Sequence, residues 1–490
     1  MKQIYYRGSL KFCNYSCSYC PFSKTGRSER QLAGDKRQWE LFIEAMRNQS
    51  FSGAIQVVPY GEALIHEYYW EGLAELSGIK SVQAVGAQSN FSFPVKRMLH
   101  IYQTCGGNTH KLRLWGTFHP EMTSVEEFLR QCQVLLEEGI SFCVGAVGVP
   151  EHVDVLRQLR EGLDESVYMW INRMDGLGRN YSEAEKQAFI QMDEYFELEL
   201  RHFPPDSAAC QGAVFVEGDG SMRQCNLCHE KIGNLYTDGL PTQGLKEVFR
   251  ERCRRRSCDC FLSYGSRTDI PELFFFQPFP AFRIPSYKKA VFFDVDGTIV
   301  ADGNRRISEK AAEKIRRLAV HSRIFLATSL PYEMAMRKVE PIAACIEGGV
   351  FAGGAELRVG TWKKIMPLDQ SWLSVIRRKA AEYHYRFRSY HRGKILYKIT
   401  LTASEPDNEI QKKMSGWNPE IPIRIICEDG RIQLTAAGTG KFQGVQEICR
   451  REGINITEIA VFGNGESDVE MIEKVPCSLH LTQLQPSWYT

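Results

Sequence analysis

The chain has 490 residues and a formal net charge of +2 at pH 7, with 43% hydrophobic and 24% charged residues. This composition is typical of globular proteins, and the length is sufficient for two or three domains. The balanced charge excludes a bulk field that attracts nucleic acid or a membrane surface. No apolar run is long enough to span a membrane, and the N-terminal residues lack the apolar core of a secretory signal. We therefore expect a cytoplasmic protein without nucleic-acid or membrane partners.

The first 200 residues alternate short apolar runs with longer amphipathic ones. This alternation predicts strands followed by helices, and hence a parallel α/β sheet or barrel. The expected strands are 54–58, 82–87, 112–117, 142–147 and 167–171, and the clearest helices are 36–48, 124–138 and 153–161.

Cysteines form two groups among the 16 in the chain, and the others stand singly among apolar residues. In a reducing compartment, cysteines at short spacings favour a metal or catalytic site over disulfides. The first group is Cys13, Cys17 and Cys20, in loop sequence after a short first strand. Three thiolates can satisfy three irons of a [4Fe–4S] cluster and leave the fourth iron open. A structural zinc ion needs four ligands, and no fourth cysteine or histidine is adjacent.

The spacing Cys13-x3-Cys17-x2-Cys20, with Tyr19 before the last cysteine, resembles the radical S-adenosylmethionine superfamily. The resemblance implies a partial (β/α)6 TIM-type barrel over residues 1–204. It also implies that S-adenosylmethionine binds the open iron and is cleaved to a 5′-deoxyadenosyl radical. An electron donor such as flavodoxin or ferredoxin is the implied partner.

Other features of that superfamily follow at successive predicted strand ends, where barrel-type sites gather. Tyr60-Gly61-Glu62 resembles its Gly-Gly-Glu element, with Tyr60 in place of the first glycine. His119 also ends a strand, where it has a turn or packing role or contacts substrate. The positions that the resemblance assigns to S-adenosylmethionine are Tyr19, Gly61, Glu62, Ser89, Asn90 and Gly148.

Residues 205–276 are rich in cysteine, glycine and arginine. Cys210, Gly220 and Cys225 resemble the opening of the SPASM and twitch extensions of radical S-adenosylmethionine enzymes, which hold an auxiliary cluster. The resemblance implies one [4Fe–4S] cluster, and a structural zinc site is the alternative. The implied ligands are Cys210, Cys225 and two of Cys253, Cys258 and Cys260, with Cys228 the least secure candidate.

Three prolines between residues 277 and 285 predict a linker over residues 277–288. A second α/β unit is expected from 289 to 490. Its strands are predicted at 289–293, 324–327 and 459–462, with a helix at 467–474. Alternating strands at 395–402, 423–427 and 432–435 indicate a mixed insertion between about 345 and 432.

The sequence Asp294-Val-Asp296-Gly-Thr298, after an apolar strand, resembles the first motif of the haloacid dehalogenase (HAD) superfamily. The resemblance implies a Rossmann-like phosphatase domain that uses Mg²⁺ and has a large α/β cap inserted at about 331–435. Asp294 is then the nucleophile and Asp296 the general acid and base. Thr328 and Lys441 are implied to bind and neutralise the phosphoryl group, and the implied metal positions are Asp294, Asp296, Asn464 and Asp468.

Asn464 stands where the family usually has aspartate. Because hard cations prefer carboxylates, this replacement is expected to weaken metal binding, and Glu466 is a possible compensation. The leading hypothesis is a bifunctional enzyme whose radical half modifies a phosphorylated small molecule, such as a sugar, nucleotide or cyclitol, and whose phosphatase half acts on that substrate or its product. The alternatives are a peptide-modifying radical enzyme with a non-catalytic HAD-like module, and a structural zinc protein with a phosphate-binding domain.

Overall fold

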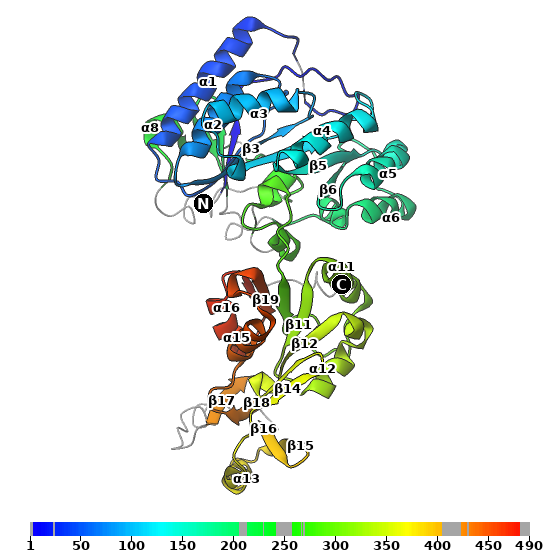
Figure 1. Ribbon diagram of the computed structural model, residues 1–490, viewed down its shortest axis with the longest axis vertical. Helices are drawn as coiled ribbons and strands as arrows, with labels where there is room; N and C mark the ends of the chain where they lie inside the picture. The colour runs from blue at the N-terminus through cyan, green and yellow to red at the C-terminus, as the bar shows by residue number, and fades with distance from the viewer. Residues whose placement is uncertain are drawn as a thin grey trace. The chain divides into compact units, whose positions relative to one another are not determined.

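The computed structural model describes residues 3–22, 25–204, 213–228, 230–241, 257–265, 267, 270–403, 423–428 and 431–480. The chain divides into two compact units, Met1–Ser286 and Tyr287–Thr490 (Figure 1). Strands and helices alternate in both units, which confirms the predicted mixed α/β class. Among the described residues, no helix is long and apolar enough to cross a membrane.

The first unit is built on a nine-stranded sheet, with the strand order β6-β5-β4-β3-β2-β1-β7-β8-β9 among the described residues. Strands β1 to β6 are mutually parallel in chain order, and β7 lies parallel to β1. Strands β8 and β9 complete the sheet as antiparallel neighbours. The strands are β1 Gln3–Arg7, β2 Gly53–Val57, β3 Val82–Ser89, β4 Leu112–Thr117, β5 Ser141–Gly148, β6 Met169–Arg173, β7 Ala213–Glu217, β8 Ser221–Arg223 and β9 Lys231–Asn234.

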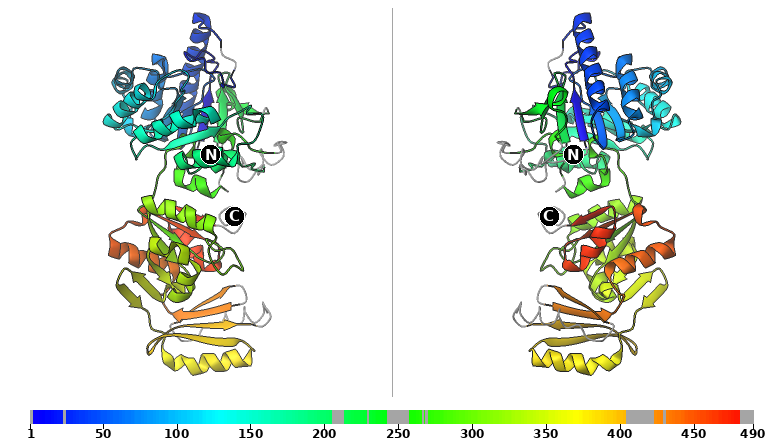
Figure 2. Two further views of the ribbon diagram at one scale, coloured as in Figure 1. Left: turned by 90° about the vertical axis from the view of Figure 1, so that its right-hand side faces the viewer. Right: turned by 90° about the vertical axis from the view of Figure 1, so that its left-hand side faces the viewer.

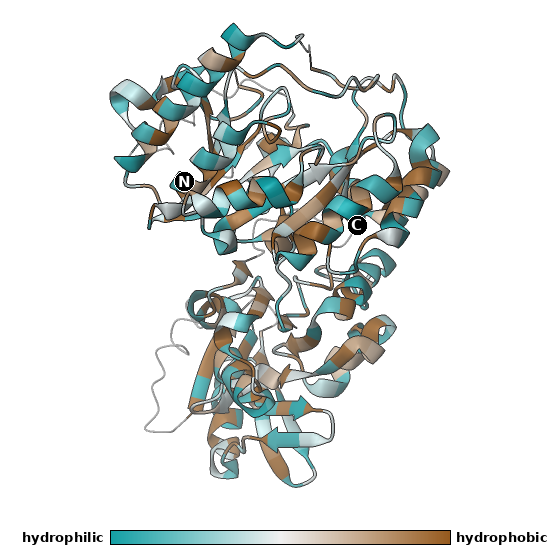
Figure 3. Ribbon diagram, turned by 45° about the horizontal axis from the view of Figure 1, so that its top comes forward, coloured by the Kyte–Doolittle hydropathy of each residue, from teal (hydrophilic) through white to brown (hydrophobic). Residues whose placement is uncertain are grey.

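Alternation along the strands separates the two faces of this sheet, because successive side chains point to opposite sides. Ile4 and Tyr6 pack with the helix residues Trp39 and Phe42, whereas Tyr5 packs on the other face. Hydrophobic residues accordingly concentrate on the strands and on the inner sides of the helices (Figure 3). The helices are α1 Glu29–Arg47, α2 Glu67–Gly78, α3 Val95–Thr104, α4 Val125–Glu137, α5 Val153–Gly162, α6 Glu183–Met192, α7 Phe196–Leu200, α8 Leu235–Asp238 and α10 Phe261–Tyr264.

Part of the predicted linker at 277–288 belongs to the core of the first unit. Phe282 and Arg283 are each 1% exposed, and the Arg283 guanidinium lies over the rings of Trp115, Trp170 and Phe261. The prolines interrupt regular structure as expected, but the aromatic and arginine side chains between them bury against the sheet. The connector is therefore shorter than the composition suggests.

The second unit has a seven-stranded sheet in the order β14-β13-β12-β11-β10-β19-β20, counted over the described residues. The strands from β12 to β20 in that order are parallel, and β13 and β14 are antiparallel additions. The elements are β10 Ala290–Phe293, α11 Glu309–His321, β11 Arg323–Ala327, α12 Tyr332–Lys338, β12 Ile346–Phe351, β13 Glu356–Val359, β14 Trp362–Ile365, α15 Lys441–Glu452, β19 Ile459–Gly463, α16 Val469–Lys474 and β20 Ser478–His480.

A four-stranded antiparallel sheet, in the order β15-β16-β18-β17, is inserted between β14 and α15 (Figure 2). Its elements are α13 Leu373–Glu382, β15 Arg386–Arg392, β16 Ile395–Thr402, β17 Ile423–Glu428 and β18 Arg431–Ala436. Ile376 and Ala380 of the helix pack with Ile399 and Leu434 of the sheet. The insertion begins after β14 rather than at the predicted residue 331, because β12 to β14 extend the main sheet.

Candidate functional site

The residues of the HAD-like motifs lie at the ends of neighbouring parallel strands in the second unit. Asp294 follows β10, Asn464 follows β19 and Thr328 follows β11. Strands β11 and β19 flank β10 on its two sides, so their carboxyl ends meet at one edge of the sheet. The backbone N–H of Asp294 donates to the Phe462 carbonyl at 2.8 Å, which fixes the start of this loop.

Lys441, the first residue of α15, joins two buried carboxylates at this edge. Its Nζ donates to Asp294 Oδ1 at 2.8 Å and to Asp468 Oδ1 at 2.7 Å. Burial raises the pKa of Asp294 to about 7, although the neighbouring Lys441 ammonium acts in the opposite direction. Burial alone lowers the pKa of Lys441, but the two aspartates together raise it above its ordinary value. Lys441 is therefore a charged, fixed hydrogen-bond donor to Asp294.

The turn after Asp294 separates the side chains of the two motif aspartates. Gly297 has a φ of +73°, and a Cβ at this position would lie 1.9 Å from the nearer terminal atom of the Asn464 amide. Only glycine fits this conformation and this close approach. The Asp296 side chain is 43% exposed, and its Oδ1 accepts from Lys338 Nζ at 2.5 Å. The fold thus gives one buried carboxylate, Asp294, and one solvent-accessible carboxylate, Asp296.

Thr328 is buried at the end of β11, where its hydroxyl oxygen accepts from the Leu330 N–H at 3.1 Å. Ser329, the next residue, lies 3.4 Å from Ser467 between the two hydroxyl oxygens. Lys398 of β16, a residue that the sequence motifs do not single out, is buried and donates to the Ser329 carbonyl. A lysine inside the apolar strand Ile395–Thr402 is the sequence signal for this contact between the insertion and the motif loop.

The Asn464 amide makes the best hydrogen bonds when its nitrogen faces three oxygen atoms. The nitrogen then lies 3.3 Å from Asp294 Oδ2, 2.9 Å from the Asp296 carbonyl oxygen and 3.1 Å from Thr298 Oγ1. Carboxylate and carbonyl oxygens are the ligands that Mg²⁺ prefers. The donor set therefore fits a divalent cation if the amide turns its oxygen inward. Among the described residues, no three His, Cys, Asp or Glu side chains form a metal-holding group, and here two of the donors are an amide and a backbone carbonyl.

We predict that Asn464→Asp tightens Mg²⁺ binding at least about tenfold, since a full charge replaces an amide dipole next to a hard cation. Without metal, the same substitution places a carboxylate against Asp294 Oδ2 and the Asp296 carbonyl, so the thermal midpoint of the metal-free protein should fall. Calorimetric Mg²⁺ titration and metal-free melting curves measure both effects. Asn304→Asp, on the loop before α11, is the matched control. Unchanged Mg²⁺ affinity in Asn464→Asp would show that residue 464 is not a ligand.

In the first unit, Glu62 is a fully buried carboxylate that links the ends of β2 and β3. Its Oε1 accepts from Ser89 Oγ at 2.8 Å and from the Leu64 N–H at 2.9 Å. Its Oε2 accepts from the Asn90 N–H at 2.7 Å. Burial raises the pKa of Glu62 to about 7, and these hydrogen bonds oppose that rise.

The loop that carries the first cysteine group is attached to this network. The N–H groups of Gly61 and Glu62 donate to the carbonyls of Leu10 and Phe12 at 3.0 and 2.9 Å. A Cβ on Gly61 would lie 1.9 Å from the Phe12 carbonyl oxygen, so this close approach requires glycine. Within the loop, Asn14 accepts from Asn90 Nδ2 at 3.0 Å. The cysteine loop, Glu62 and Asn90 therefore form one connected site.

Cys17 is buried, and Cys13 and Cys20 are partly buried in this loop. The Tyr19 hydroxyl is hydrogen bonded to His119 Nδ1 at 3.0 Å, which places His119 against the cysteine loop. The three thiols are the donor type that an iron–sulfur cluster needs. In the described part of the chain they are not gathered closely enough to form a metal-holding group. Gly148 lies at the end of β5, where its carbonyl accepts from the Tyr181 hydroxyl at 2.8 Å.

We predict that Glu62 makes the stability of the first unit depend on pH. The pKa of Glu62 is about 7 in the folded protein and has its ordinary, lower value in the unfolded chain. Between these two values the folded state holds a proton that the unfolded state has lost, so the free energy of unfolding falls as pH rises toward 7. The free energy of unfolding of wild type relative to Glu62→Gln should fall by about 1.4 kcal/mol per pH unit across this window. Denaturant unfolding at pH 5 to 8 measures it, with the exposed Glu71→Gln as control. A pH-independent difference would contradict the prediction.

The second cysteine group is only partly within the described residues. Cys210 and Cys253 lie outside them. A hydrogen bond with Cys228 lowers the pKa of Cys225 to about 7, and burial opposes this shift. Asn226 Nδ2 donates to Cys260 Sγ at 3.3 Å. Cys228, the candidate considered least secure from the sequence, is thus in contact with Cys225.

Comparison with known proteins agrees with the geometry of the second unit. The family of haloacid dehalogenase-like hydrolases matches residues 378–485. Phosphoglycolate phosphatase of Archaeoglobus fulgidus is 22% identical over 189 residues, which are 37% of this chain and 78% of that protein. The C-terminal unit is a HAD-like hydrolase domain.

Solved structures of HAD proteins are also similar to part of the chain. A HAD subclass IIB sugar phosphatase is 20% identical with a TM-score of 0.36, covering 41% of this chain and 90% of that one. A haloacid dehalogenase-like hydrolase from B. subtilis is 12% identical with a TM-score of 0.34, covering 41% and 92%.

Proposed function

We propose that the C-terminal unit hydrolyses phosphate monoesters of small molecules. The observation that carries this proposal is the buried Lys441 that joins Asp294 and Asp468 at the ends of β10 and β19. An Asp294 oxygen attacks phosphorus, the bond to the alcohol oxygen breaks, and an aspartyl phosphate forms. Asp296 protonates the leaving oxygen and then removes a proton from the water that releases phosphate. Lys441 holds Asp294 in place and offsets the charge of the phosphoryl oxygens.

Asp294, the Asp296 carbonyl and the Asn464 amide are the groups proposed to hold Mg²⁺, which HAD phosphatases use. When bound, the cation would neutralise charge on the phosphoryl group. Thr328, buried at the neighbouring strand end, is proposed to donate its hydroxyl to a phosphoryl oxygen.

Phosphate release from a panel of sugar, nucleotide and cyclitol phosphates, with Mg²⁺ and with a chelator, tests this activity. We expect Mg²⁺-dependent turnover of at least one class. No release from any ester, in protein shown to be folded, would favour a domain that binds a phosphorylated ligand without hydrolysing it.

We further propose that the first unit is a radical S-adenosylmethionine enzyme in which Cys13, Cys17 and Cys20 hold a [4Fe–4S] cluster. The supporting observation is the hydrogen-bond chain from Glu62 through Asn90 to Asn14, which connects the cysteine loop to two strand ends. The cluster, when bound, would supply the electron that cleaves S-adenosylmethionine. Glu62 is proposed to accept its amino group, Ser89 and Asn90 to bind its ribose, and Gly148 to line the adenine. Flavodoxin or ferredoxin is the proposed electron donor.

The second cysteine group is proposed to hold an auxiliary cluster. The hydrogen bond between Cys225 and Cys228 supports Cys228, already a candidate from the sequence, as one of the ligands. Iron and sulfide analysis of anaerobically purified protein distinguishes the possibilities: about 4 irons indicate one cluster and about 8 indicate two. Zinc without iron would exclude radical chemistry.

The two units together are proposed to act in sequence on a phosphorylated small molecule. Untargeted metabolite profiling with and without S-adenosylmethionine tests this order, and a modified peptide as the product would favour the peptide-modifying alternative.

A further inference from the structure

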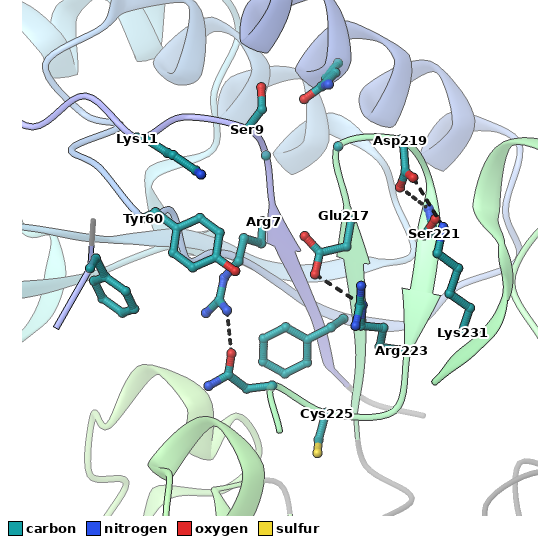
Figure 4. A pocket seen from close by; sticks show the side chains of 16 residues that line it. Arg7, Ser9, Lys11, Tyr60, Glu217, Asp219, Ser221, Arg223, Cys225 and Lys231 are labelled. Carbon is teal, nitrogen blue, oxygen red and sulfur yellow. Dashed lines mark hydrogen bonds and ion pairs between the residues drawn. The ribbon is translucent and has the colours of Figure 1, made fainter. Parts of the chain in front are cut away.

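A cavity of about 550 Å³ lies in the first unit beside the ends of β1, β7 and β8 (Figure 4). Phe22 and Tyr60 border it from the cysteine loop and from the Gly61-Glu62 segment. Its size is in the range of small-molecule sites, about 300–1,000 Å³. None of the residues assigned so far to S-adenosylmethionine, the clusters or phosphate hydrolysis lines it except Cys225.

Charge in this cavity is not balanced. Four cationic side chains line it against two carboxylates, and both carboxylates are already paired. Glu217 pairs with Arg223 and Asp219 with Lys231, each at 3.5 Å. Among the described residues, Arg7 and Lys11 have no carboxylate within ion-pair distance. Figure 4 shows Arg7, Lys11 and Tyr60 on one side of the cavity and the two ion pairs on the other.

Arg7 is only 6% exposed, yet no described acid forms an ion pair with it. Its Nε donates to the Val58 carbonyl at 3.0 Å, and its Nη1 donates to Asn226 Oδ1. The guanidinium lies over the Tyr60 ring at 4.7 Å and near the Phe215 ring at 5.5 Å. These contacts hold Arg7 in one orientation. Glu217 interacts through its charge with both Arg7 and Arg223, so one carboxylate is shared by two guanidinium groups. Burial of a positive charge without a carboxylate of its own is costly, so the arrangement favours an anionic ligand.

We infer that this cavity binds a phosphate-bearing small molecule, with Arg7 and Lys11 on its phosphate and the rings of Tyr60, Phe215 and Phe22 against its organic part. Guanidinium groups match the geometry of phosphate oxygens, and a flexible lysine adds a second charge. The inference rests on the proposed function and names its substrate class. The radical unit and the phosphatase unit would then both recognise the same phosphate group on one metabolite.

Photolabelling of the full chain with 4-azidophenyl phosphate tests this inference at the cavity itself. The Asp294→Asn background prevents hydrolysis of the probe by the second unit. We expect adducts on peptides that contain Tyr60 or residues 213–223, competed by inorganic phosphate and absent with 4-azidophenol. Lys11→Met should reduce this labelling about tenfold and Arg7→Met still further, since each removes a charged partner of the phosphate. Arg7→Lys should retain most of it, and Lys96→Met, an exposed lysine on α3, should change nothing.

Labelling confined to the second unit, or equal labelling of the Lys11→Met variant and its control, would overturn the inference. Lys11 is exposed, so its substitution keeps the test valid if the Arg7 variants do not fold. The proposed activities are measured separately, as phosphate release and as cleavage of S-adenosylmethionine. Labelling of the cavity in a protein that shows neither activity would support binding of a phosphate-bearing ligand and would reject the proposed function.

Discussion

Replacing Asp294 by asparagine is expected to abolish phosphate release from every ester that the wild-type protein hydrolyses, by at least about a thousandfold in kcat. Asparagine has nearly the same shape, and its oxygen can still accept the hydrogen bond from Lys441 Nζ, now 2.8 Å from Asp294 Oδ1. An amide oxygen is a poor nucleophile toward phosphorus, however, so the aspartyl phosphate does not form. Steady-state phosphate release at saturating Mg²⁺ measures the loss.

The matched control for this substitution is Asp302→Asn, because Asp302 is an exposed aspartate in the same loop region. It should retain wild-type kcat and KM. Thermal melting of both variants shows whether the second unit is folded, since Lys441 keeps Asp468 as a partner in each. Activity of Asp294→Asn within a few-fold of wild type would reject Asp294 as the nucleophile. In metabolite profiling, the same variant should accumulate a phosphorylated product if the two units act in series.

The strand ends on which both candidate sites depend are predictable from the sequence. The apolar runs before Asp294 and before Tyr60-Gly61-Glu62 are fully buried strands, β10 and β2. Buried parallel strands have continuous apolar sequences, and the polar residue that follows marks the strand end. The apolar pattern predicts where these strands end. The resemblance of the motifs to the HAD superfamily implies that Asp294, Thr328 and Asn464 belong to one site.

The contacts that depend on tertiary packing are not predictable in this way. Lys398 reaches the Ser329 carbonyl across about 70 residues, and Arg7 meets Asn226 across more than 200. The two partners in each pair are far apart in the sequence, so no short motif predicts their contact. Each contact forms only when distant segments of the chain pack together. The predicted cap also begins too early, since β13 and β14 continue the main sheet by antiparallel pairing instead of starting a new one.

Replacing Cys13, Cys17 and Cys20 together by alanine is expected to remove about 4 irons per chain and all cleavage of S-adenosylmethionine. These thiols are the proposed ligands of the first cluster, and the adjacent network of Asn14, Asn90 and Glu62 contains no other thiol. Phosphate release should stay at the wild-type level, because the second unit has its own sheet and core. Iron content, 5′-deoxyadenosine formation and phosphate release measure the three quantities on one preparation.

Cys105→Ala is the control for this triple variant, because Cys105 is an exposed single cysteine at the end of α3. Its iron content should equal that of wild type. A triple variant that keeps every iron atom would mean that the second cysteine group holds all of the metal. That result would remove the open iron from the loop beside Glu62, and with it the physical basis for binding S-adenosylmethionine there. Loss of iron with unchanged 5′-deoxyadenosine formation would equally contradict the assignment, because the electron for cleavage would then come from another source.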